Sequence, residues 1–351
     1  MNGHETGPDA PREREFDFLR VDEFLRSLLP SCALGVALQS GLIDFLVQNG
    51  PAAAETLADR FAADAKGMRL LLDQLLANRV LTDDHGRFAL SEDFLKALSY
   101  RDLMELKLEM SNLGVFDLLR FFPDLVFRPG EFARKSDFCG LFAYDRCFEK
   151  SEESVRLTRR WMRITTVLTK YEAQACLKYH DFGGYRRILD VGGNSGEFAL
   201  RICRSHPRAE VTVFDLPLVC EIGAAHVQRE PEAKRISFVK GNALGDPWPS
   251  DFDLVSFKST LHDWPEEAAG RLMTSAAEAL RPGGTLLVFE RGPLETSGTP
   301  VAYAHIPFFL FQHSFRSPRF YTQRMQALGF RNIGVRILDL GTPFLLVTGV
   351  R

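Results

Sequence analysis

The sequence lacks a charge excess of either sign. Its 43 Lys and Arg residues nearly balance 46 Asp and Glu residues, so the formal net charge is -3. Such a chain has no global field that would attract nucleic acid or an anionic membrane surface. We therefore expect a small neutral or amphipathic molecule as its partner.

Cysteine is scarce, and its spacing carries no metal pattern. The six residues form no CxxC pair and have no histidine companions at zinc-ligand spacing, so we expect no metal site and reduced thiols in the core. Long apolar runs are also absent: no stretch of about 18 apolar residues occurs, and the first residues are polar. These absences predict no membrane insertion and a cytoplasmic location.

The length predicts more than one domain, because 351 residues exceed the size at which one hydrophobic core usually stops growing. Residues 1–15 are polar and contain Gly and Pro, so we expect a flexible tail. Changes in pattern then suggest a winged-helix-like domain over residues 16–110, a helical linker and pocket region over 111–180, and an α/β domain over 181–351.

The first of these regions has the pattern of a helix-turn-helix with a wing. Helical spacing predicts one helix through residues 34–46, a short helix near Leu57, a longer one over 68–76 and a two-stranded wing over 80–90. This motif often binds DNA. However, the first 110 residues carry 12 Lys and Arg against 19 Asp and Glu, whereas duplex binding depends largely on neutralising phosphates. A DNA-binding regulator is thus the less favoured alternative.

Large aromatic residues are concentrated between residues 102 and 179. Most are expected to form core, but ligand clefts are also lined by aromatic side chains and tend to lie at domain junctions. A second Phe-rich stretch, HIPFFLFQHSFRSPRF, precedes the last predicted helix. The candidates for substrate contacts from both stretches are Phe142, Trp161, Met162, His305 and Phe309.

After Gly183 and Gly184 the periodicity changes to short apolar runs that alternate with helices. The predicted strands are RRILDVGG, EVTVFDLP, RISFVKGN, FDLVSFKST and GTLLVFERG, with helices starting near Gly196, Pro217 and Pro265. Strands that are apolar on both faces and separated by helices imply a parallel sheet covered on both sides. NIGVRILD and FLLVTGV flank a turn and predict a hairpin that adds an antiparallel strand at the edge.

The segment ILDVGGNSGEFALRI runs from a strand through a Gly-rich turn into a helix, which suits a nucleotide-like ligand. The dinucleotide fingerprint needs Gly at its first, third and sixth positions, but these hold Gly192, Asn194 and Glu197, which disfavours a nicotinamide or flavin. Asp215 ends the next strand and is placed to accept hydrogen bonds from both hydroxyls of a ribose. The alternative role of Asp215 is a helix cap before Pro217.

Five motifs together resemble one family. LDVGGNSG, FDLP, GNAL, FKSTLHDW and LRPGGTLLVFE occur in the order and at closely similar spacing found in class I small-molecule O-methyltransferases of the caffeic acid and hydroxyneurosporene type. The resemblance extends over nearly the whole chain. It implies a Rossmann-like α/β catalytic domain with a mostly parallel seven-stranded sheet and an antiparallel C-terminal hairpin strand, behind an N-terminal winged-helix-like dimerisation domain. It also implies S-adenosyl-L-methionine as cofactor, a small-molecule substrate and a homodimer.

The resemblance also implies roles for individual residues. His262 matches the family's general base, Asp263 belongs to the same HDW motif, and Glu290 matches one of two acidic residues that flank the base. The implied cofactor contacts are Asp190, Gly192, Gly193, Asp215, Leu216, Asn242, Ala243 and Lys258. Methyl transfer from a sulfonium requires mainly positioning and an activated nucleophile, and an imidazole base suits a phenol or enol better than an aliphatic alcohol.

The chain departs from the family pattern at two places. Asn242 stands where the family usually carries Asp, although an amide oxygen also accepts hydrogen bonds. SFRSPRFYTQRM replaces the family's acidic ERTxxEW pattern, so the second acidic partner of the base has no clear counterpart. This leaves carbon or nitrogen methylation, or a non-methylating reaction with the same cofactor, as alternatives.

Overall fold

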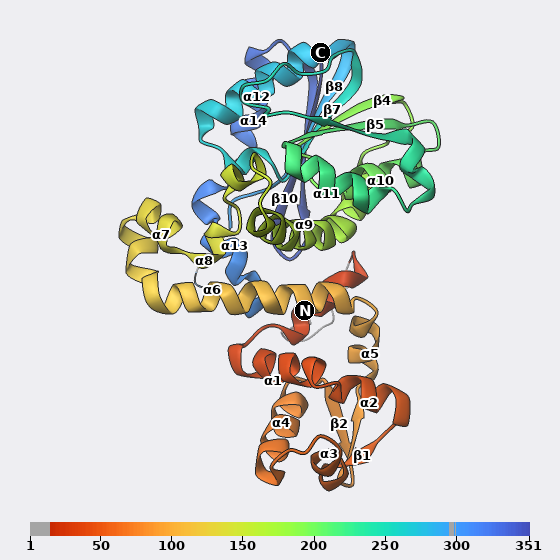
Figure 1. Ribbon diagram of the computed structural model, residues 1–351, viewed down its shortest axis with the longest axis vertical. Coiled ribbons are helices and arrows are strands. Elements are labelled where there is room, and N and C mark those ends of the chain that lie inside the picture. The colour runs from red at the N-terminus through yellow and green to blue at the C-terminus, as the bar shows by residue number, and fades with distance from the viewer. Residues whose placement is uncertain (1–14, 295–297, 299) are drawn as a thin grey trace, which may run out of the picture.

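The computed structural model describes residues 15–351 except residues 295–297 and 299 (Figure 1). All of the predicted tail but Glu15 lies outside these residues. The described chain forms an N-terminal helical part, a middle part dominated by two long helices, and a C-terminal part built around a sheet.

The N-terminal part contains the predicted helix-turn-helix and wing. Its elements are η1 (Asp17–Phe24), α1 (Leu28–Gln39), α2 (Leu42–Asn49), β1 (Ala52–Ala53), α3 (Ala54–Arg60), α4 (Ala65–Ala77), β2 (Leu81–Asp84), β3 (Arg87–Leu90) and α5 (Glu92–Leu98). The wing strands β2 and β3 pair antiparallel, and β1 adds a third strand. The prediction of one continuous helix through residues 34–46 is wrong, because the chain forms two helices, α1 and α2, that meet at 66°. Gly41 lies between them with φ +82°, a left-handed conformation that glycine tolerates.

The middle part connects the two ends of the molecule. It consists of α6 (Arg101–Phe127), α7 (Pro129–Lys135), α8 (Asp137–Gly140), η2 (Tyr144–Cys147) and α9 (Glu152–Tyr179). In Figure 1, α6 crosses the molecule between the N-terminal helices and the sheet. It continues past the boundary expected at residue 110 and is kinked at Phe121, two residues before Pro123.

The C-terminal part is the predicted mostly parallel sheet of seven strands, in the order β6-β5-β4-β7-β8-β10-β9. The strands are β4 (Arg187–Val191), β5 (Glu210–Asp215), β6 (Ile236–Lys240), β7 (Phe252–Lys258), β8 (Leu280–Arg291), β9 (Arg331–Asp339) and β10 (Pro343–Val350). The hairpin prediction is confirmed, but β10, which is antiparallel to β8, lies one place in from the edge, and β9 forms the edge.

Helices cover both faces of this sheet. They are α10 (Glu197–Ser205), α11 (Pro217–Val227), α12 (Glu266–Ala279) and α14 (Pro318–Ala327). The short helix α13 (Ile306–Leu310) packs against α6 instead, and the 3-10 turns of this part are η3 (Pro231–Arg235), η4 (Leu261–Asp263), η5 (Tyr303–His305) and η6 (Gln312–Ser314). Alternate strand residues face opposite cores: Ile188 packs with α9 and α10, whereas Leu189 packs with α12 and α14. Because β6, β5, β4, β7 and β8 run parallel, their carboxyl ends lie at one edge of the sheet, where ligands bind in open α/β folds.

Four of the six free cysteines are buried, and Cys139 is half-buried. The expectation of a core position is wrong for Cys32, which lies on the exposed side of α1. Among the described residues, no single helix is long and apolar enough to cross a membrane, although the bent pair of α1 and α2 meets that test together.

Candidate active site

The Gly-rich turn between β4 and α10 requires its glycines. Gly192 has φ +67°, and a Cβ atom there would lie 2.6 Å from Cγ2 of Thr260. A Cβ atom at Gly193 would lie 2.5 Å from Oδ2 of Asp190. Both distances are too short for real atoms, so the turn can approach its neighbours this closely only without side chains.

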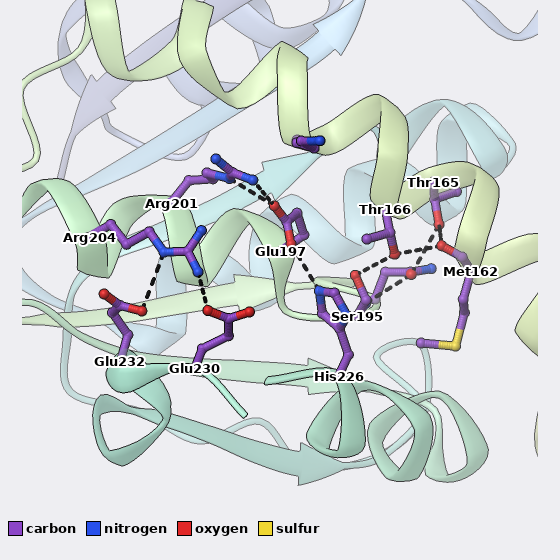
Figure 2. Close-up of polar contacts among 12 residues, drawn as sticks. Met162, Thr165, Thr166, Ser195, Glu197, Arg201, Arg204, His226, Glu230 and Glu232 are labelled. Atoms are coloured by element: carbon purple, nitrogen blue, oxygen red, sulfur yellow. Dashed lines mark hydrogen bonds and ion pairs between the residues drawn. The ribbon is translucent and has the colours of Figure 1, made fainter. Parts of the chain in front are cut away.

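Helix α9 fixes the same turn from the opposite side. Thr165 donates from Oγ1 to Oδ1 of Asn194 at 3.0 Å, and Thr166 shares a 2.7 Å hydrogen bond with the hydroxyl of Ser195. Figure 2 shows both threonines directed from the helix toward the turn, and Glu197 between Arg201 and His226 one residue after Gly196. These hydrogen bonds attach the turn to α9.

Two buried carboxylates lie at the ends of the central strands. Asp215 accepts from the backbone N–H groups of Asn194 at 2.8 Å and Leu216 at 2.7 Å, and burial raises its pKa to about 6. Asp190 accepts from Ser256 at Oδ1, while its Oδ2 is buried without a partner among the described residues, and burial raises its pKa to about 7. An unpaired buried oxygen beside a glycine cradle fits a ligand that donates hydrogen bonds.

The next turn contributes Asn242 and Ala243 to the wall of the same pocket. The side-chain oxygen of Asn242 accepts from the backbone N–H of Leu244 at 3.0 Å, and the backbone N–H of Asn242 donates to Oδ2 of Asp246 at 2.7 Å. The amide that replaces the family's carboxylate therefore stabilises its own turn.

Lys258 belongs to a buried ion-pair cluster at the pocket wall. Its Nζ atom lies 2.9 Å from Oγ1 of Thr169 and 2.5 Å from Oε2 of Glu172, and Arg291 pairs with the other oxygen of Glu172. Burial opposes ionisation of Glu172, but the Arg291 and Lys258 charges outweigh it and lower its pKa to about 2. Arg291 also lies 4.0 Å from the ring centroid of Phe308, so the cluster connects β7, β8, α9 and α13.

His262 lies on η4, just beyond the carboxyl end of β7, with Nδ1 2.5 Å from Oε2 of Glu290. Glu290 is fully buried, and its Oε1 accepts from the backbone N–H groups of Thr260 and Leu261 at 2.7 and 2.6 Å. A carboxylate held in this way accepts the Nδ1 proton and leaves Nε2 of the neutral ring as the acceptor. Burial alone would lower the pKa of His262, but the Asp263 and Glu290 carboxylates outweigh it and raise the pKa above the ordinary value of 6.5.

The segment that lacks the family's acidic pattern packs directly on the base. The ring of Phe315 lies 5.5 Å from the imidazole, centroid to centroid, at 69°. Arg316 donates to the backbone oxygens of Leu261 and Trp264 and so holds the η4 loop. The segment therefore contributes an aromatic contact and a loop clamp to the base.

Aromatic and aliphatic side chains form the part of the pocket in front of His262. Phe142 and Trp161 line it as predicted. Met162, Phe309 and His305 are not among its lining residues: Met162 packs against α11, Phe309 packs in an apolar cluster with α6, and Nε2 of His305 lies 3.2 Å from Asp22. Helical geometry explains these differences, because residues adjacent in a helix point in different directions.

The match to known families decides the identity of this pocket. Residues 133–331, more than half of the chain, match the O-methyltransferase domain, and residues 23–93 match the O-methyltransferase dimerisation domain. The chain belongs to the O-methyltransferase family. The predicted family, its fold and S-adenosylmethionine as its cofactor are thereby confirmed.

Individual relatives are distant from this chain in sequence. It is 29% identical over 276 residues to a human protein described as a probable bifunctional dTTP/UTP pyrophosphatase/methyltransferase, covering 77% of this chain and 44% of that protein. It is 35% identical over 139 residues to the 3-hydroxy-5-methyl-1-naphthoate 3-O-methyltransferase of Streptomyces sahachiroi, covering 40% of each. The chain thus spans less than half the length of both relatives. The structure of human N-acetylserotonin methyltransferase in complex with S-adenosylmethionine has the same fold, with a TM-score of 0.68, 22% identity, and 92% and 93% of the two chains covered.

The sequence did not single out several polar residues that line the pocket, among them Tyr144, Glu172 and Arg291. Arg291 directly follows the predicted Glu290, and Glu172 lies 11 positions after Trp161 on one face of α9, but no local motif marks either residue. In the described part of the chain, no group of three or more His, Cys, Asp or Glu side chains could hold a metal ion.

Proposed function

We propose that the protein transfers the methyl group of S-adenosylmethionine to a phenolic or enolic hydroxyl of a small aromatic molecule, with His262 as general base. The observation that carries this proposal is the pairing of Nδ1 with buried Glu290, which leaves Nε2 to accept a proton from a substrate in the pocket. The chain's own contribution is to orient this imidazole, exclude water from it, and stabilise the imidazolium between carboxylates.

The cofactor would lie along the carboxyl ends of β4, β5 and β7. Asp215 would hold the ribose, and the adenine would lie against Leu216, Asn242 and Ala243. Asp190, Gly192 and Gly193 would surround the methionine portion. Lys258 would contact it from β7. When bound, the cofactor supplies an electrophilic methyl group on a sulfonium, a good leaving group, so the protein has to activate only the acceptor.

The part of the pocket in front of His262 favours an aromatic, largely apolar substrate. The apolar residues that line it are Met110, Phe138, Phe142, Ile164, Leu168, Phe308 and Phe311. Such surfaces bind flat rings by burial and by edge-to-face contact. The Streptomyces sahachiroi relative is described as acting on a hydroxylated naphthoate, which agrees with this class of acceptor.

The protein would act as a homodimer, which the dimerisation-domain match supports. Exposed apolar side chains on α1 and α6 offer a surface for the second copy, among them Leu28, Leu29, Phe116, Leu119 and Phe127. We retain the division into a dimerisation domain (16–110), a pocket region (111–180) and a catalytic domain (181–351), with α6 shared between the first two. The six free thiols agree with a reducing, cytoplasmic environment.

Replacement of His262 tests the function. We expect His262→Ala to lower kcat by about 10² to 10⁴, the usual contribution of a positioned base, while the calorimetric affinity for S-adenosylhomocysteine stays within about twofold. The measurement is transfer of labelled methyl groups to a panel of phenolic acceptors. His85→Ala, in the exposed turn of the wing, is the matched control and should retain full activity. Turnover by His262→Ala within a few fold of the parent would contradict the proposal.

A further inference from the structure

A hydrogen bond beside the base joins two distant parts of the chain. Tyr144, on η2, donates its hydroxyl hydrogen to Oδ2 of Asp263 at 2.6 Å, although 119 positions separate the two residues. Tyr144 belongs to the helical middle part and Asp263 to the loop that follows β7, so they approach from different walls of the pocket. The bond occupies one oxygen of Asp263 and leaves the other, Oδ1, 3.4 Å from Nε2 of His262.

Tyr144 is itself fixed in place. Its ring contacts Trp161 and Trp264, with centroid distances of 5.2 and 5.8 Å. The loop that carries it is held by Arg146, which donates to the backbone oxygens of Gly140 and Leu141. Burial, reinforced by the nearby Asp263 charge, raises the pKa of Tyr144 well above its ordinary value, so its hydroxyl remains a donor at every working pH.

The surroundings of His262 contain a second carboxylate even though the family's usual one is missing. The titratable or charged groups that face the pair formed by His262 and Asp263 are Glu290 and Arg291 from β8, Tyr144 on η2, and Arg316 from the segment that follows η6. Tyr321 lies behind them, near Glu290 and Arg316. On the Nδ1 side the partner is Glu290, and on the Nε2 side it is Asp263. Phe315 contributes no charge.

We propose that Tyr144 is a positioning residue for the base: it holds Asp263 as an ionised second carboxylate beside Nε2 of His262. This inference rests on the proposed function. The proton of the acceptor hydroxyl moves to Nε2, and the oxygen retains the electron pair that forms the new O–C bond as the S–C bond breaks. Asp263 receives no proton and stabilises the imidazolium through its charge.

The geometry also explains why the tyrosine hydroxyl matters. Burial raises the pKa of Asp263, whereas the His262 charge and the Tyr144 hydrogen bond oppose that rise. Without the hydroxyl, Asp263 is more easily protonated and free to rotate. The pKa of His262 then falls, because the Asp263 charge is one of the two that raise it.

Tyr144→Phe tests this role in the full-length protein. The first measurement is the NMR titration of His262 without ligand, assigned by comparison with His262→Ala, and we expect its pKa to fall. The second is kcat with the best phenolic acceptor, expected to fall about tenfold, the value of one hydrogen bond to a charged group. The third is calorimetry with S-adenosylhomocysteine, whose Kd should stay within about twofold. Tyr185→Phe, which removes a hydroxyl bonded to Thr285 away from the pocket, should change none of these quantities.

A double-mutant cycle makes the result decisive. Asp263→Asn should reproduce both effects, and combining it with Tyr144→Phe should add nothing, because the tyrosine acts through Asp263. An unchanged His262 titration in Tyr144→Phe, additive losses in the double variant, or weakened S-adenosylhomocysteine binding as the only effect would overturn the inference. An active His262→Ala variant would instead overturn the proposed function, so the two failures are distinguishable.

Discussion

Asp215 shows how one buried side chain can make cofactor binding depend on pH. In the proposed function its carboxylate accepts from the ribose hydroxyls, and only the ionised form accepts at both oxygens. Burial raises its pKa to about 6, so below that pH binding must first remove a proton. We expect the Kd for S-adenosylhomocysteine to rise about tenfold per pH unit below about 6, with a smaller change between about pH 6 and 7, where Asp190 titrates.

Calorimetry between pH 5 and 8 measures this dependence. Asp190→Asn is the control for the neighbouring carboxyl, whose own pKa is raised to about 7, and this variant should keep the transition near pH 6. Asp215→Asn should bind more weakly and lose the transition. A Kd that does not change with pH in the parent protein would show that Asp215 is not the ribose contact.

At the scale of single residues, prediction from sequence succeeded where chemistry is encoded in a short local pattern. Gly192, Gly193, Asp215 and His262 all lie in the pocket, because each lies at or shortly after the carboxyl end of a strand, and these ends meet at one edge of the sheet. Tyr144 was not predicted, because its role depends on a hydrogen bond across 119 positions that no local pattern records.

Glu172 connects helix α9 to the sheet through buried ion pairs. This carboxylate pairs with Lys258 of β7 and with Arg291 of β8, and all three side chains are more than nine-tenths buried. Replacing it by a neutral amide leaves two buried cations without a counter-ion, which typically costs about 3–5 kcal/mol. We therefore expect Glu172→Gln to lower the free energy of unfolding by about 3 kcal/mol at pH 7, measured by urea denaturation.

The same contribution has a defined pH dependence. Because the pKa of Glu172 is lowered from 4.5 to about 2, its stabilisation is complete above about pH 4.5 and is lost as the pH falls toward 2. The difference between Glu172→Gln and the parent should therefore shrink in acid. Glu267→Gln, which removes an exposed ion pair with Arg271, should leave stability unchanged. Equal stability of Glu172→Gln and the parent would contradict this role of the cluster.

At the scale of elements, the sequence predicted the strands and their helices well, because apolar runs and Gly or Pro boundaries are local signals. Two features were not predicted, for physical reasons. The break between α1 and α2 depends on the backbone conformation of Gly41, and the apolar residues on either side of it keep the spacing of a continuous helix. The place of β10 inside the sheet depends on pairing with β8, 53 to 65 positions earlier, and not on its own sequence.

At the scale of the whole molecule, α6 connects the dimerisation region to the pocket. Met110 on this helix is buried and lines the pocket, whereas Phe116, Leu119 and Phe127 further along it are exposed. Large apolar side chains exposed in a row are typical of a surface that another protein covers. The family match to a dimerisation domain ends at residue 93, so this row would extend the interface beyond that domain.

Charge introduced on this row should separate the two copies. Leu119 and Phe127 are 78% and 79% exposed, and burial of a side chain of this size contributes about 1.5–3 kcal/mol. Because each substitution occurs twice in a symmetric dimer, Leu119→Lys combined with Phe127→Lys should weaken dimerisation at least about 10³-fold and yield monomers in light scattering at micromolar concentration. Ile337→Lys, at a 63% exposed position on the edge strand β9, is the matched control and should remain dimeric. A double lysine variant that stays dimeric would place the interface on other residues, and a monomeric parent would remove the homodimer altogether.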